Sequence, residues 1–187
     1  MKIIGVIGQN GSGKDEVLKY LKAKYNIPFL STGDMVREIA AKEGKAPTRE
    51  NLGEISERYF REFGRGCFVK LAAGKIRENN WKVGGITGIR ALEDVEALKS
   101  GFGSDFILIN VYVSDPQERY RRMVKRGEGR DPQSYEQFLR QDAAEEELFH
   151  IRSAVPRADY SIANNTTLDG LHSEIDRLVA GKGLLAA

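Results

Sequence analysis

Apolar residues in this chain gather into short continuous runs separated by longer stretches of helical spacing. A continuous apolar run is typical of a strand that is covered on both faces, because such a strand has no solvent side. FILINVYV, at 106–113, is the longest of these runs. The predicted strands are 3–7, 27–31, 81–86, 106–113 and 159–163.

Apolar positions three and four residues apart predict helices between these strands. Pro47 and Thr48 mark a break and a helix cap between two consecutive helices. Five strands joined through helices predict an α/β fold with a parallel sheet and helices on both faces, whose ligands bind at the carboxyl ends of the strands. The predicted helices lie near 17–21, 35–40, 52–63, 67–79, 92–99, 117–126, 134–150 and 168–179.

Composition narrows the class of protein. A chain of 187 residues is the size of one α/β domain. Its net charge of +2 gives no reason to expect nucleic acid, and no run approaches the roughly 20 apolar residues of a membrane span. The single cysteine, Cys67, cannot form an internal disulfide, so we expect a reducing, cytoplasmic location.

The strongest chemical signal is GQNGSGK, which follows the first strand and precedes the first helix. Its spacing matches a phosphate-binding loop: the glycines permit a tight turn whose amides point inward, and the lysine faces the β and γ phosphates. The alternative is a glycine turn with a surface lysine. The predicted nucleotide-binding residues are Gly8, Gln9, Asn10, Gly11, Ser12, Gly13 and Lys14, and Lys14 is also a catalytic candidate.

Two carboxylates follow the lysine, where many phosphate loops carry a hydroxyl that binds magnesium. Asp15 is a candidate metal ligand, directly or through water, and the alternative is that it only stabilises the helix N-terminus. Glu16 also belongs to the predicted nucleotide site, with a solvated helix position as its alternative.

STGDMVR, at 31–37, closely resembles the corresponding segment of adenylate kinases and related nucleoside-monophosphate kinases. The resemblance implies that Arg37 grips the acceptor phosphate, that Asp34 supports magnesium, and that Thr32 and Gly33 belong to the acceptor site. A guanidinium fork suits phosphate oxygens, although a solvated helix arginine is the alternative.

TGIR, at 87–90, resembles a second segment of the same kinases and makes Arg90 the other acceptor clamp and a catalytic candidate. Thr87 stands where those kinases have an aspartate that helps to hold magnesium. The alternatives are that Thr87 only ends a strand and that Arg90 is a solvent-facing arginine at a helix start. We therefore hypothesise that Asp15 compensates for the charge missing at Thr87.

The segment 118–130 holds six basic residues and two glutamates. In the resembled kinases a short lid lies here, and its arginines close over the transferred phosphoryl group. Arg119 and Arg126 fit the catalytic positions, and a solvated basic helix or a nucleic-acid patch is the alternative. Arg130 and Arg140 are further lid candidates.

RADYSIANNTTLDGL, at 157–171, is similar to the terminal segment of dephospho-coenzyme A kinases. Asn164 is therefore assigned to the nucleotide site, near the adenine. A turn rich in Asn and Thr also simply ends a strand and caps a helix, which is the alternative.

Together these resemblances imply a three-layer P-loop NTPase fold with a helical acceptor-binding insertion at 33–80 and a short lid at 119–140. The implied activity moves the γ-phosphoryl group of ATP, with Mg²⁺, to a nucleoside monophosphate or another small molecule. GTP in place of ATP stays open, because the sequence has no NKxD-type motif that would select the base. Small-molecule nucleotides are then the partners, without nucleic acid or membrane. The alternatives are a nucleotide-binding switch without kinase activity and a kinase acting on dephospho-coenzyme A or another alcohol.

Overall fold

A computed structural model of the chain describes residues 1–182 and 184. Its core is one five-stranded sheet in which every pairing is parallel, in the order β2-β3-β1-β4-β5. This confirms the predicted α/β class and the parallel sheet. The strands are β1 (Lys2–Ile7), β2 (Phe29–Ser31), β3 (Val83–Ile89), β4 (Phe106–Tyr112) and β5 (Tyr160–Ala163).

The central strand β1 separates two hydrophobic cores. Ile3 and Ile7 pack into one core, while Ile4 and Val6 pack into the other, and all four side chains are fully buried. Successive side chains of a strand point to opposite faces, so a strand between two helical layers must be apolar at nearly every position. This two-sided burial explains why residues 3–7 form a short apolar run in the sequence.

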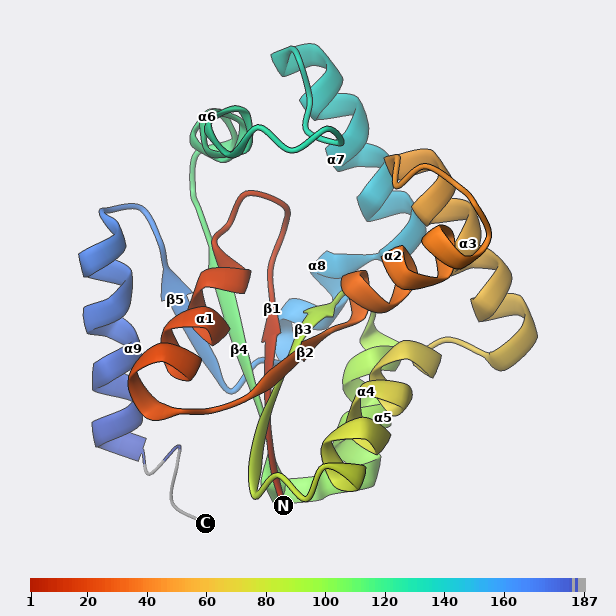
Figure 1. The fold of residues 1–187 in the computed structure, drawn as a ribbon. Helices are drawn as coiled ribbons and strands as arrows, with labels where there is room; N and C mark the ends of the chain where they lie inside the picture. Colours follow the sequence, from red (N-terminus) through yellow and green to blue (C-terminus); the bar gives the residue numbers. More distant parts are fainter. Residues whose placement is uncertain (183, 185–187) are drawn as a thin grey trace.

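Helices cover both faces of the sheet. In Figure 1, α1 and α9 lie on one face, and α4, α5 and α8 lie on the other. The four-residue helix α8 was not predicted, because it is too short to show a helical period. The helices are α1 (Lys14–Tyr25), α2 (Thr32–Lys42), α3 (Arg49–Phe63), α4 (Cys67–Glu78), α5 (Leu92–Phe102), α6 (Pro116–Arg126), α7 (Tyr135–Phe149), α8 (Ile151–Ala154) and α9 (Leu168–Lys182).

Side-chain caps fix where the helices around the site begin. The backbone N–H of Asp34 donates to Ser31 Oγ at 3.2 Å at the start of α2, and that of Asn51 donates to Thr48 Oγ1 at 3.2 Å at the start of α3. Each cap satisfies a helix N–H that has no partner within the helix. The cap predicted at Thr48 is thereby confirmed.

The carboxyl ends of β1 and β3 lie side by side, with Val6 paired to Thr87 and Ile7 to Ile89. The loop after β1 therefore lies beside the end of β3, and α2, α3 and α7 lie toward the same end of the sheet (Figure 1). In the described residues, no helix combines the length and apolarity needed to cross a membrane.

Candidate phosphoryl-transfer site

The glycine-rich loop between β1 and α1 has the tight backbone that its sequence requires. Gly11 has a φ of 77° and Gly13, the N-cap of α1, has a φ of 90°, which is left-handed backbone that favours glycine. A Cβ at Gly11 would lie 2.6 Å from the backbone oxygen of Arg119. Because that neighbour is backbone, a side chain there would push the loop away from α6.

Lys14 begins α1 and is buried, at 7% exposure. Its ammonium donates to the backbone oxygen of Gln9 at 3.4 Å. Burial lowers the pKa of Lys14, and the nearby carboxylate of Asp15 opposes this shift. A buried ammonium at a helix N-terminus is a strong attractor for a phosphate.

Asn164, just after β5, braces this loop. Its side-chain amide donates to the backbone oxygen of Ser12 at 2.9 Å, and its backbone N–H donates to Tyr112 at 2.8 Å. The side chain is buried and packs close to Gly13. In this structure Asn164 joins the last strand to the phosphate loop, and its contact with adenine remains a prediction.

Asp15 and Thr87, paired in our hypothesis, are in direct contact. The Thr87 hydroxyl donates to Asp15 Oδ1 at 2.6 Å. Burial favours the neutral acid, but Lys14, this hydrogen bond and Arg90 outweigh it, so the pKa of Asp15 lies below its usual value. Glu16 points instead toward α9, where its carboxylate lies 3.6 Å from His172 Nε2.

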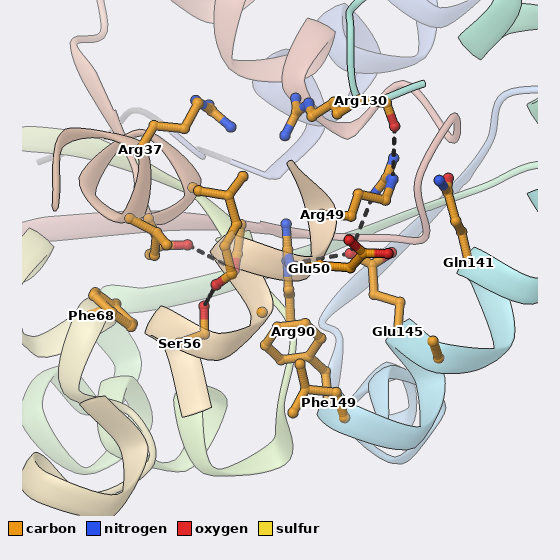
Figure 2. Close-up of a pocket in the computed structure, with 18 of the residues that line it drawn as sticks. Arg37, Arg49, Glu50, Ser56, Phe68, Arg90, Arg130, Gln141, Glu145 and Phe149 are labelled. Carbon is orange, nitrogen blue, oxygen red and sulfur yellow. Dashed lines mark hydrogen bonds and ion pairs between the residues drawn. The ribbon is translucent and has the colours of Figure 1, made fainter. Parts of the chain in front are cut away.

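A cavity of about 500 Å³ opens between α2, α3, α7 and the end of β3 (Figure 2). Its lining includes all four residues assigned to acceptor binding and two of the lid candidates. These six are Thr32, Gly33, Arg37, Arg90, Arg130 and Arg140. An apolar wall is formed by Val36, Leu52, Phe60, Phe68, Leu148 and Phe149.

The start of α2 and the end of β3 are tied together at this cavity. The Thr32 hydroxyl donates to the backbone oxygen of Gly88 at 2.9 Å. At the next turn, Asp94 accepts from the backbone N–H of Arg90 at 3.0 Å and of Ala91 at 3.1 Å. Arg37 is held by Asp34, to which its Nε donates at 3.1 Å.

Glu145 of α7, which we did not select from the sequence, is an acid of the cavity lining whose side chain is largely buried. It accepts from the side-chain amide of Asn10 in the phosphate loop and pairs with Arg90 at 3.1 Å and Arg49 at 4.0 Å. Its side chain is 9% exposed. Burial disfavours its charge, but Arg90, Lys14 and Arg49 together hold the pKa of Glu145 below its usual value.

Arg49, at the first position of α3, is the second residue that sequence reasoning missed. Its Nε donates to the backbone oxygen of Arg130 at 3.2 Å, and its guanidinium lies 3.9 Å from Asp131. It therefore joins the acceptor side of the cavity to the loop that follows α6. The cap at Thr48 locates Arg49 at a helix start, but nothing local in the sequence indicates its distant partners.

The two predicted catalytic lid arginines have separate acidic partners. Arg119 is buried and forms two parallel hydrogen bonds with Asp142, at 2.7 and 2.8 Å, and it also donates to the backbone oxygen of Asn10 at 3.2 Å. Arg126 donates through Nε to Asp131 at 2.9 Å. Its charge acts on both Lys14 and Asp15, so it lies within electrostatic range of the loop.

The two metal candidates lie in different surroundings. Asp15 is next to the phosphate loop, whereas Asp34 is exposed and paired with Arg37. Over residues 1–182 and 184, no three or more His, Cys, Asp or Glu side chains form a cluster that could hold a metal ion. Any metal at Asp15 would thus take most of its ligands from elsewhere, such as phosphate oxygens and water.

The fold and this loop define a P-loop protein of the kinase-like class. The chain matches the family described as "AAA domain" over residues 7–139. It belongs to the UPF0200 protein family. A relative from Thermococcus sibiricus is 35% identical, with 97% of this chain and 96% of that protein covered. Another, from Methanosarcina mazei, is 32% identical, with coverage of 94% and 92%.

Solved structures with the same fold include shikimate kinases. The enzyme from Bacteroides thetaiotaomicron aligns with a TM-score of 0.59 and 17% identity, covering 100% of this chain and 99% of that one. The enzyme from Acinetobacter baumannii, in complex with shikimate, aligns with a TM-score of 0.56 and 19% identity, covering 97% and 94%. At this identity the likeness establishes the fold.

Proposed function

We propose that the protein is an ATP-dependent phosphotransferase that acts on an acceptor carrying a phosphate, with nucleoside monophosphates as the leading class. One observation carries the proposal: a cavity lined by Arg37 and Arg90 is joined to the phosphate loop through Glu145, which also lines the cavity and accepts from the side-chain amide of Asn10. The guanidinium of Arg90 is close enough to affect the pKa of Lys14. In this proposal the cavity arginines anchor the acceptor through its phosphate, whether the oxygen that receives the new phosphoryl group belongs to that phosphate or to a hydroxyl.

The donor side fits the phosphates of a nucleoside triphosphate such as ATP. The loop has glycine at positions where a side chain would collide with neighbouring groups. The buried ammonium of Lys14 supplies a positive charge at the N-terminus of α1. Asp15 and Thr87 offer the oxygen atoms that magnesium prefers. When bound, the ion would neutralise charge on the phosphates.

The acceptor side combines charge with an apolar wall. Arg37, together with Arg90 or Arg130 of the same lining, would fix the acceptor phosphate, and the aromatic rings of Phe60, Phe68 and Phe149 would cover an apolar or planar group. Holding the acceptor and ATP in one orientation supplies much of the catalysis in phosphoryl transfer, and no covalent nucleophile is required.

A coupled assay of ADP release tests this function. ATP is offered with each nucleoside monophosphate in turn and with dephospho-coenzyme A. We expect release of ADP that depends on one class of acceptor and far exceeds the release without acceptor. Nucleotide binding without turnover under every acceptor would contradict the proposal and favour a nucleotide-binding switch.

The hypothesis for Asp15 makes a separate prediction. Because Asp15 would support magnesium, Asp15→Asn is expected to raise the Mg²⁺ concentration needed for half-maximal turnover about tenfold. The measurement is a magnesium titration of the ADP-release rate at saturating ATP and acceptor. Asp34→Asn is the companion variant for the other metal candidate. An unchanged magnesium dependence in Asp15→Asn would remove this role.

A further inference from the structure

Glu145 lies at the junction between the donor loop and the acceptor cavity. The Asn10 amide contacts it from the phosphate loop, and Arg90 contacts it from the end of β3. Figure 2 shows its carboxylate between Arg90 and Arg49, inside the cavity. The charges of Glu145 and Lys14 also act on each other, so this carboxylate lies within electrostatic range of the site for the transferred phosphoryl group.

An ionised carboxylate at this junction disfavours one kind of acceptor oxygen and suits another. The surrounding cations keep the pKa of Glu145 low, so the group is charged at neutral pH. A phosphate oxygen brought beside it would meet like charge in a buried setting. A hydroxyl would donate its hydrogen to the carboxylate and so be both held and activated.

Two other arginines of the cavity, Arg37 and Arg130, offer a binding site for the acceptor's own phosphate away from Glu145. Arg90 is already paired with Glu145, whereas Arg37 and Arg130 pair with Asp34 and Glu128, acids outside the cavity lining. Figure 2 shows the guanidinium ends of Arg37 and Arg130 turned toward each other, away from Glu145. A phosphate held by these two arginines would leave another part of the acceptor facing the donor loop.

We propose that Glu145 is the catalytic base of this enzyme and that the group it phosphorylates is a hydroxyl of an acceptor anchored by its own phosphate. This inference rests on the proposed kinase function. As the hydroxyl oxygen bonds to the γ phosphorus, its proton passes to Glu145. The bond from that phosphorus to the bridging oxygen of ATP breaks, ADP leaves with the electron pair, and Glu145 then releases the proton to water.

The first test identifies the product made by the wild-type enzyme from whichever acceptor supports ADP release. Phosphorus NMR of the purified product is expected to show a new phosphate monoester without coupling to another phosphorus. Coupled resonances from a new P–O–P linkage would overturn the role of Glu145 while leaving the kinase function intact. Absence of turnover with every acceptor would overturn the kinase function and this inference together.

The second test compares Glu145→Gln with Glu147→Gln, the same change at an exposed position of the same helix. Glutamine keeps a hydrogen-bond acceptor but takes up no proton. Glu145→Gln is therefore expected to lower kcat about 10²-fold or more with little change in the acceptor KM, and the control should match wild type. A lower KM with kcat retained would show that Glu145 merely obstructs an anionic acceptor, and would overturn the proposal.

Folding is checked by thermal unfolding of each variant. Should Glu145→Gln fail to fold, Glu145→Asp keeps the charge but withdraws the carboxylate by one methylene. The proposal then expects a reduced kcat, because the base no longer reaches the hydroxyl, with the acceptor KM again little changed. Wild-type kcat in a folded Glu145→Asp would contradict it.

Discussion

Replacement of Lys14 by methionine is expected to lower ATP-dependent turnover about 10³-fold, because it removes a preorganised positive charge from the phosphate site. The same change should leave the free energy of unfolding equal or higher. Burial lowers the pKa of Lys14, and its ammonium donates only a long hydrogen bond to Gln9, so its charge costs stability in the folded protein.

The ADP-release assay measures the first effect and urea unfolding measures the second. Lys19→Met is the matched control, since Lys19 is an exposed residue of the same helix. The control should behave as wild type in both measurements. A Lys14→Met enzyme with most of its turnover would exclude a role for this ammonium in phosphoryl transfer.

Of all the variants proposed, Arg119→Met is expected to lose the most stability. The side chain is 4% exposed and forms a two-pronged pair with Asp142, whose own side chain is 16% exposed. Removing Arg119 leaves that carboxylate without its cation and frees the backbone oxygen of Asn10, to which Arg119 also donates. We expect the free energy of unfolding to fall by about 3 to 5 kcal/mol.

Urea unfolding of Arg119→Met beside Arg121→Met checks this value. Arg121 lies on the same helix and pairs with Glu118 at 2.8 Å, but its side chain is 61% exposed. An exposed pair of this kind contributes about 1 kcal/mol or less. Equal free energies of unfolding for the two variants would mean that the buried Arg119 pair stabilises the protein no more than the exposed Arg121 pair does.

The phosphate loop was the part of the site that sequence reasoning located best. Its glycines, its lysine and the helix after it are all local features, and their geometry follows from backbone conformation. The resemblance at 31–37 and 87–90 also assigned Arg37 and Arg90 to one site, and they line the same cavity. Their role in binding an acceptor stays a prediction.

The contacts that join the separate parts of the site could not be predicted from local sequence patterns. Asn10 and Glu145 are in contact although 135 positions separate them. Likewise, Arg119 was assigned to a lid over the phosphoryl group, whereas its hydrogen bonds in this structure run to Asp142 and the phosphate loop. The helical spacing of an arginine does not indicate which acidic residue it will pair with in the folded protein.

By itself, the sequence determined the strands, the main helices and the phosphate loop, because these depend on the spacing of apolar residues and on glycine conformation over a few neighbouring positions. Only the tertiary structure decided which charges meet. The packing of α3 and α7 over the end of β3 brings Arg49 and Glu145 beside Arg90, and such convergence depends on helix placement, which no local pattern encodes.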